Sequence, residues 1–148
     1  MTATPSLTPY IVVDRAREAI AFYTAAFGAE VLFTLTDPDD GRIGHAELKL
    51  GASVLMLADE YPDFGALAPG AYGGSPVKLH FYVEDVDAVF ARAVSLGAAE
   101  LRPVKAQFHG DRSGMLADPF GHIWFLATKG EEVPPEEMQA RWDASMAR

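Results

Sequence analysis

The stretches YIVVDRAREAIAFYTAAFGAE (Tyr10–Glu30) and HFYVEDVDAVFARAVSLGAAE (His80–Glu100) decide the fold, because both follow one pattern. Each reads as a strand, an acidic turn, an amphipathic helix and a glycine that ends the helix, and then Ala and Glu. The later stretches ASVLMLAD (Ala52–Asp59) and GHIWFLAT (Gly121–Thr128) also correspond. The sequence therefore predicts two tandem βαβββ modules.

The two predicted helices each carry an apolar stripe at helical spacing. Asp14 and Asp85 are the expected N-caps, while Gly28 and Gly97 are expected to end the helices. Both stripes should be buried in the core. Their members are Ala19, Ile20, Tyr23, Ala26 and Phe27 in the first helix and Val86, Val89, Phe90, Ala93 and Leu96 in the second.

Alternation along the predicted strands assigns side chains to the two faces of each sheet. The purely apolar face is expected under the helix, which leaves the other face open. A hairpin around Gly51 would pair Glu47 with Met56, so these two side chains share the open face. The other expected members of the open faces are Thr8, Tyr10, His45, Lys49 and Val54 in the first module and Lys78, His80 and Tyr82 in the second.

The composition argues against nucleic acid and membranes as partners. The chain has 148 residues and a net charge of −9, whereas anionic surfaces need clustered Lys and Arg. The first residues, MTATPSLTPY, lack the features of a signal peptide, and no apolar run reaches the roughly 20 residues of a membrane span. The chain has no cysteine, which excludes disulfides and fits a reducing compartment. We therefore expect a cytoplasmic globular protein.

The predicted organisation has four parts: a first module over residues 6–60, a Gly/Pro-rich connection or lid over 61–77, a second module over 78–128 and a helical tail over 129–148. The connection carries Tyr61, Phe64 and Tyr72, which either cover a cleft or pin the loop to the core. In the tail, Pro134-Pro135 opens a short helix. Its stripe of Met138, Trp142 and Met146 must pack on the body or on a partner chain.

The stretches AIAFYTAAFGAE, VEDVDAVFARAVSLGA and DPFGHIW together resemble the vicinal oxygen chelate superfamily, which groups glyoxalases, bleomycin-resistance proteins and extradiol dioxygenases. The segments GHAELKLGASVLMLAD, LHFYVEDVDAV and GDRSGMLADPFGH are similar to its PhnB-like members. The resemblance spans roughly residues 6–128 and implies an α+β fold, in which two βαβββ modules form a curved mixed sheet cup with helices outside. It does not define the reaction, because one fold serves many functions.

Enzymes of this superfamily hold a divalent metal with four strand residues, typically His and Glu, and the metal chelates two neighbouring oxygens of the substrate. The corresponding positions here are Thr8, Met56, Lys78 and Phe125. A lysine ammonium has no lone pair to give and repels a cation, so the resemblance implies that the usual site is absent. No cofactor is expected. The alternative is a divalent metal in a displaced site built from His45, Glu47 and His80.

The sequence leaves three alternative functions open. The expected one is the binding of a small, partly aromatic organic molecule in the cup, as in the drug-binding members of the superfamily, many of which are homodimers. A homodimer is therefore expected here too. The cup would be lined by Tyr10, Glu47, Met56, Lys78, His80, Tyr82 and Phe125.

The second function is an enzyme of lyase, isomerase or dioxygenase type that acts on a small oxygenated substrate. Glu47 and His80 would be its catalytic acid and base, or metal ligands, and Lys78 would stabilise an enolate oxygen. The third is a structural or interaction role through the C-terminal stripe. This last role leaves the polar side chains of the open faces unexplained.

The stretch ADPFGHIWFLAT (Ala117–Thr128) places a histidine at the start of the last strand. Asp118 to Gly121 have the composition of a turn. Alternation puts His122 and Trp124 on one face and Phe125 on the other. Because Phe125 is expected to face the cup, His122 is interpreted as a turn or edge residue rather than a catalyst.

Overall fold

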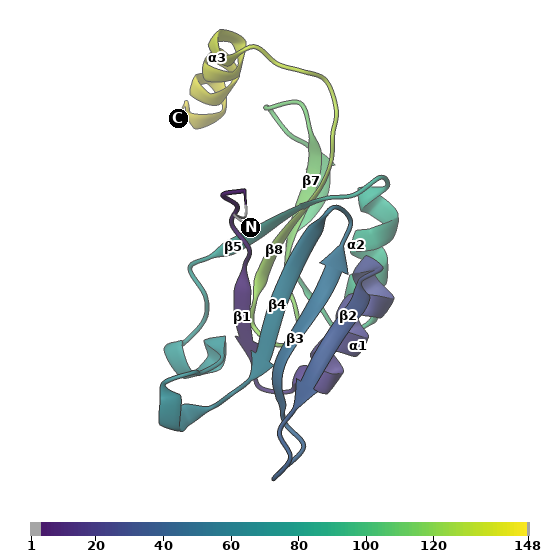
Figure 1. The fold of residues 1–148 in the computed structure, drawn as a ribbon. Helices are drawn as coiled ribbons and strands as arrows, with labels where there is room; N and C mark the ends of the chain where they lie inside the picture. Colours follow the sequence, from purple (N-terminus) through teal and green to yellow (C-terminus); the bar gives the residue numbers. More distant parts are fainter. Residues whose placement is uncertain (1–3, 148) are drawn as a thin grey trace. The chain divides into compact units, whose positions relative to one another are not determined.

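The computed structural model describes residues 4–147 as two compact units that repeat one order of elements (Figure 1). The first unit extends to Pro76 and also includes Pro119–Gly121. The second comprises Val77–Asp118 and the chain from His122 onward. Each unit carries one four-stranded mixed sheet. The predicted α+β fold of two βαβββ modules is confirmed.

The first unit builds its sheet in the order β1-β4-β3-β2. Its elements are β1 (Tyr10–Val13), α1 (Ala16–Phe27), β2 (Glu30–Thr36), β3 (Ile43–Leu50) and β4 (Ser53–Asp59). Strand β1 runs parallel to β4, and the other pairs are antiparallel. Glu47 lies opposite Met56, as the hairpin prediction requires. The tight turn uses Gly51 at φ 58°, which a glycine adopts without strain.

Helix α1 covers one face of this sheet (Figure 1) and buries most of its predicted stripe. Phe22 is also buried, although the predicted stripe did not include it, whereas Ile20 stays half-exposed. The prediction that Asp14 caps α1 is wrong. Asp59, at the end of β4, instead accepts hydrogen bonds from the backbone N–H of Ala16 and of Ile43, both at 2.8 Å. A carboxylate from a strand of the same unit thus caps the N-terminus of α1 in place of a local residue.

The second unit repeats the arrangement with the strand order β5-β8-β7-β6. Its elements are β5 (Lys78–Tyr82), α2 (Val86–Ser95), β6 (Ala99–Ala106), β7 (Arg112–Ala117), β8 (Ile123–Thr128) and α3 (Pro135–Met146). The predicted cap is confirmed, since Asp85 accepts a hydrogen bond from the backbone N–H of Ala88 at 3.2 Å. Leu96 lies beyond the end of α2 and is exposed, contrary to its place in the predicted stripe.

Strand β6 is irregular in a way that controls where its cations point. Arg102 lies opposite Met115 and Lys105 opposite Ser113, so three steps on β6 match two steps on β7. The extra residue makes a β-bulge, a feature typical of edge strands that contain proline, here Pro103. As a result Arg102 and Lys105 share one face, which strict alternation would forbid.

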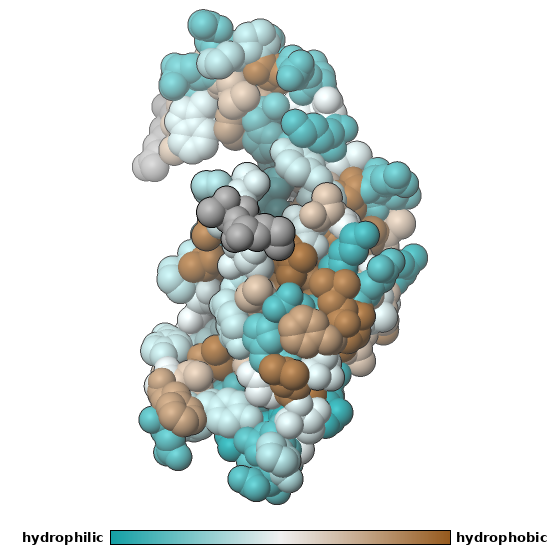
Figure 2. Space-filling model, in the orientation of Figure 1, coloured by the Kyte–Doolittle hydropathy of each residue, from teal (hydrophilic) through white to brown (hydrophobic). Residues whose placement is uncertain are grey.

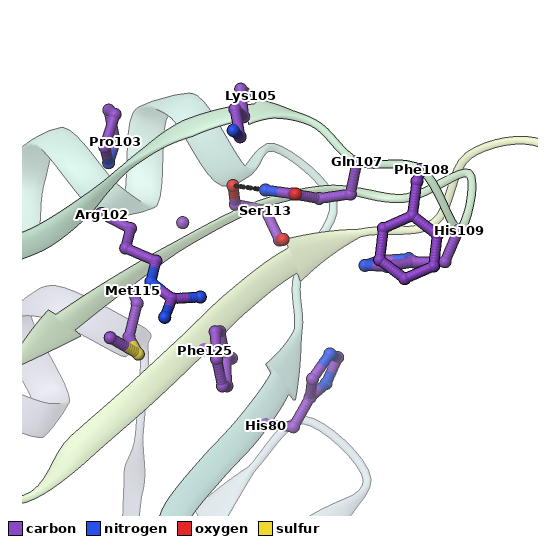
Figure 3. Close-up of a pocket in the computed structure, with 11 residues that line it drawn as sticks. His80, Arg102, Pro103, Lys105, Gln107, Phe108, His109, Ser113, Met115 and Phe125 are labelled. Atoms are coloured by element: carbon purple, nitrogen blue, oxygen red, sulfur yellow. Dashed lines mark hydrogen bonds between the residues drawn. The ribbon is translucent and has the colours of Figure 1, made fainter. Parts of the chain in front are cut away.

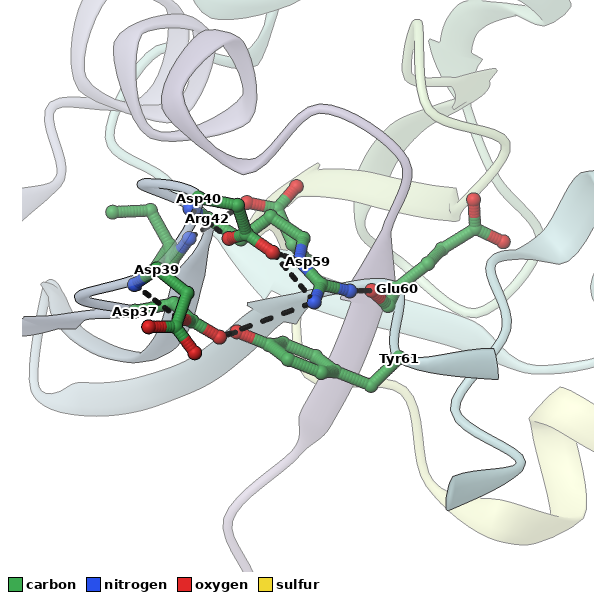
Figure 4. Close-up of polar contacts among 8 residues, drawn as sticks. Asp37, Asp39, Asp40, Arg42, Asp59, Glu60 and Tyr61 are labelled. Atoms are coloured by element: carbon green, nitrogen blue, oxygen red, sulfur yellow. Dashed lines mark hydrogen bonds and ion pairs between the residues drawn. The ribbon is translucent and has the colours of Figure 1, made fainter. Parts of the chain in front are cut away.

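Tyr61, the first residue of the Gly/Pro-rich connection, anchors this connection to the first unit. The hydroxyl of Tyr61 donates a hydrogen bond to Asp37 at 3.0 Å. The guanidinium of Arg42 lies 3.9 Å from the centre of the Tyr61 ring and pairs with Asp40 at 2.8 Å (Figure 4). Tyr61 therefore pins the connection. Phe64, by contrast, is 85% exposed.

The Asp118–Gly121 turn is a structural element. Asp118 is buried and accepts hydrogen bonds from the backbone N–H of His122 at 3.0 Å and from the indole N–H of Trp124 at 2.9 Å. Trp124 is buried and Phe125 is half-buried on the opposite face, as predicted. Phe120 packs with the aromatic side chains of α1. His122 thus takes part in closing the turn through its backbone.

The tail helix begins at Pro135, as Pro134-Pro135 predicts. Within residues 4–147, none of the helices has both the length and the apolar character needed to cross a membrane.

Candidate functional site

A pocket of about 490 Å³ lies on the open face of the second unit's sheet (Figure 3). All four strands and the β6–β7 loop contribute to it. Its lining consists of His80, Arg102, Pro103, Lys105, Gln107, Phe108, His109, Ser113, Gly114, Met115 and Phe125. Of the residues predicted to bind a ligand or to act on it, His80 and Phe125 line this pocket.

Aromatic and apolar side chains form the floor of the pocket. His80 and Phe125 are partners in the register of the parallel pair β5–β8, and their ring centres lie 6.2 Å apart at an interplanar angle of 38°. Met115 lies on the other side of Phe125, in the antiparallel pair β7–β8. This floor can pack against a planar organic molecule.

Polar groups stand around this floor. The Arg102 guanidinium extends into the space between Met115, Ser113 and Phe125 (Figure 3). The side-chain amide of Gln107 donates a hydrogen bond to the backbone carbonyl of Ser113 at 3.1 Å, which ties the β6–β7 loop to β7. The lining contains cationic and neutral side chains and no carboxylate.

The C-terminal tail supports the pocket wall at Phe108. The ring of Trp142 on α3 lies 5.5 Å from that of Phe108 in an edge-on arrangement. Arg141 donates a hydrogen bond to the Phe108 carbonyl at 3.1 Å. The tail also approaches the loop closely, because a side chain at Gly130 would collide with the Gly110 carbonyl. The wall of the pocket thus depends on the tail.

Tyr82 supports the pocket from outside its lining. Its hydroxyl donates a hydrogen bond to Asp111 at 2.8 Å, and its ring lies 4.7 Å from that of His80. The hydrogen bond to Asp111, burial and the Asp111 charge together raise the pKa of the Tyr82 phenol. Tyr82 therefore stays protonated and keeps its hydrogen bond to Asp111, while its ring packs against that of His80. Lys78 is exposed on the same face of β5 and is not part of the lining.

The open face of the first unit carries a hydrogen-bonded chain of Tyr10, His45 and Glu47. The Tyr10 hydroxyl lies 2.9 Å from Nδ1 of His45, and Nε2 of His45 lies 2.9 Å from Oε2 of Glu47. Because a carboxylate can only accept, the Nε2–H of His45 donates a hydrogen bond to Glu47, and Nδ1 accepts a hydrogen bond from the Tyr10 hydroxyl. Met56 lies beside Tyr10 and Glu47 in the register.

Burial, followed by the negative charge of Glu47, raises the pKa of the Tyr10 phenol. Tyr10 therefore keeps its proton near neutral pH. In this arrangement Glu47 orients the His45 ring, and the ring holds the Tyr10 hydroxyl. When the Tyr10 hydroxyl rotates from Nδ1 of His45 toward a substrate, its one proton becomes available, which is the function of a general acid.

The four side chains that the sequence resemblance assigns to metal-ligand positions do not fit a divalent cation. Thr8 and Met56 in the first unit, and Lys78 and Phe125 in the second, include neither a carboxylate nor an imidazole. Both nitrogens of His45 are already hydrogen-bonded to other side chains. Within residues 4–147, no three His, Asp or Glu side chains group as metal ligands. His45 and Glu47 belong to the first unit and His80 to the second.

The main pocket residues that sequence reasoning missed are Arg102 and Lys105. Alternation along a regular strand would place them on opposite faces, and the bulge between them reverses this. Pro103 is the sequence signal that could have revealed it, because proline within a strand marks an edge or a bulge. Phe108 and Gln107 were missed because they lie on a loop, where periodicity carries no information.

Comparison with known proteins places this geometry in context. A model of the Glyoxalase/Bleomycin resistance protein/Dioxygenase superfamily matches residues 5–126. The uncharacterized protein Rv0887c of Mycobacterium tuberculosis is 42% identical over 139 residues, which cover 92% of this chain and 81% of that protein.

Two solved structures share the fold. Protein PA1353 from Pseudomonas aeruginosa has a TM-score of 0.72 at 22% identity, with 86% of this chain and 100% of that chain covered. The PhnB protein from Bacillus cereus has a TM-score of 0.66 at 23% identity, with 84% and 99% covered.

Proposed function

Because this chain belongs to the glyoxalase/bleomycin resistance/dioxygenase superfamily, we propose that it binds a small, partly aromatic organic molecule in the pocket of its second unit, without the metal site usual in the superfamily. The observation that carries the proposal is the pocket itself. Its volume of about 490 Å³ is in the range of small-molecule sites, and such sites combine apolar walls with a few polar anchors. His80 and Phe125 supply the floor of the pocket, and Arg102 supplies a polar anchor.

A titration with small naphthalene and indole derivatives, both neutral and charged, tests the proposal. Calorimetry measures the affinities, because naphthalene and indole rings absorb and emit light in the same range as tryptophan. Phe125→Ala should weaken binding about tenfold, since a truncated aromatic contact costs on the order of 1.4 kcal/mol. Phe64→Ala, at an 85% exposed position of the first unit, is the control and should bind as wild type does. Absence of saturable binding across the panel would contradict the proposal.

A second candidate function is acid–base catalysis, which the Tyr10–His45–Glu47 chain favours. In this function Glu47 takes a proton from the carbon beside a carbonyl group while Tyr10 protonates the carbonyl oxygen, and both protons return in the reverse step. The sequence paired Glu47 with His80 instead. Exchange of substrate C–H protons in D₂O, followed by NMR with small oxo acids and ketones, measures it. Wild type should exchange them and Tyr10→Phe should not. Equal rates for the two proteins would remove this candidate.

We also propose that the chain forms a homodimer and works in the cytoplasm, as the sequence suggests. Support for the dimer comes from β2, an edge strand with apolar side chains exposed on both faces: Val31, Leu32, Phe33 and Leu35 are 44–58% exposed. Apolar side chains gather over this strand (Figure 2). An unpaired apolar edge is a surface that natural proteins cover. Light scattering should return twice the 16.0 kDa of one chain, and the mass of a monomer at high concentration would contradict it.

A further inference from the structure

We infer that the ligand of the second unit's pocket is an aromatic oxyanion, that is, a planar ring bearing a carboxylate or phosphate group. This inference rests on the proposed function and adds the charge of the ligand to it. The feature behind it is a pair of cations, Arg102 and Lys105, on the rim of a pocket that has no acidic lining residue.

The fold brings these two cations together by an irregularity. The bulge at Pro103 aligns Arg102 with Met115 and Lys105 with Ser113, and both of these partners also line the pocket. Without the extra residue, one of the two cations would point to the helix side of the sheet. Val104 occupies that side instead, since a side chain at Gly114 would meet Val104 and Phe90.

Neither cation has a counter-ion among the residues that the structure describes. Among residues 4–147, Arg42, Arg112 and Arg141 each pair with at least one carboxylate at 2.9 Å or less. Within residues 4–147, neither Arg102 nor Lys105 forms an ion pair with a carboxylate. The whole chain carries a net charge of −9, so carboxylates are abundant. Two neighbouring cations that stay unpaired in such a chain are therefore available to an external anion.

The cationic rim and the aromatic floor of the pocket together define the class of ligand. A guanidinium presents a planar fork of donors that matches carboxylate and phosphate oxygens. The guanidinium of Arg102 extends over the floor made by Met115 and Phe125 (Figure 3). An anionic group held there would leave its attached ring against Phe125 and His80. A ligand with only one of these two parts would leave either the cations or the floor unused.

Calorimetric titration with three matched probes tests the inference: 2-naphthoate, 2-naphthyl phosphate and 2-naphthamide. At least one of the two anions should bind about tenfold more tightly than the neutral amide at low salt, which corresponds to one charge-assisted contact. The difference should shrink as salt is added, because the cations are exposed and exposed charges are screened. The stronger of the two anions identifies the oxyanion.

Variants separate this inference from the proposed function. Arg102→Gln should weaken the preferred anion about tenfold and leave the amide unchanged, while Arg102→Lys should keep part of the preference. Arg92→Gln, which removes the same charge from the exposed face of α2, should change neither. If the amide binds as tightly as both anions, or if Arg102→Gln has no effect, the inference that the ligand is an anion is contradicted. The proposed function would then still hold. If none of the three probes binds, both are contradicted.

Discussion

Replacement of Phe120 by Ala should lower the free energy of unfolding by about 3–4 kcal/mol. Phe120 is only 6% exposed, and its ring centre lies 6.2 Å from those of both Phe22 and Tyr23. The guanidinium of Arg15 lies 5.0 Å from the same ring. Truncation would remove these contacts and leave a cavity beside α1. Urea denaturation followed by circular dichroism measures the loss.

Two further variants make this result specific. Phe120→Leu keeps most of the buried volume and should cost less than half as much. Phe64→Ala removes the same ring from a site that is 85% exposed, and it should change stability by about 0.5 kcal/mol or less. A loss below about 1 kcal/mol for Phe120→Ala would mean that the turn does not contribute to the core of the first unit.

Replacement of Asp118 by Ala should cost about 3 kcal/mol, because it leaves two donors without an acceptor. The indole N–H of Trp124 and the backbone N–H of His122 both donate to this carboxylate, at 2.9 and 3.0 Å. Asp118 is 4% exposed and Trp124 is 3% exposed, so water cannot easily replace the lost acceptor. Each hydrogen bond to a charged group is worth about 1.5–3 kcal/mol.

The matching measurements again use chemical denaturation. Asp118→Asn retains one acceptor oxygen and should lose about half as much as Asp118→Ala. Asp39→Ala, in the exposed β2–β3 turn, removes a carboxylate of the same kind and should be nearly neutral. Equal stability of Asp118→Ala and Asp39→Ala would show that the buried carboxylate is not needed for the turn.

These two residues show how far the sequence could be interpreted. The Asp-Pro-Phe-Gly composition predicts a turn, because each residue type favours it locally. The sequence did not reveal that Phe120 packs against α1, since that contact joins positions about 100 residues apart. Turn chemistry is a local property, whereas burial depends on the tertiary fold.

The same distinction explains the helix caps and the site. Asp85 caps its own helix and was predicted from local sequence, but Asp59 supplies the hydrogen bond for α1 from another strand. The open faces of the sheets followed from alternation, which placed Glu47 beside Met56. Alternation could not have placed Arg102 and Lys105 on one face, because a bulge inserts one residue into β6 between them. Regular periodicity was predictable, and departures from it were not.

A titration of uniformly ¹⁵N-labelled protein with 2-naphthoate, followed by amide chemical shifts, shows where on the protein the ligand binds. Binding in the second unit's pocket predicts saturable shifts at Gln107, Ser113 and Phe125, which line it. The amides of Tyr10 and Glu47 on the first unit's open face should stay unchanged. Shifts confined to those first-unit amides, or no saturable shift at any position, would contradict the account.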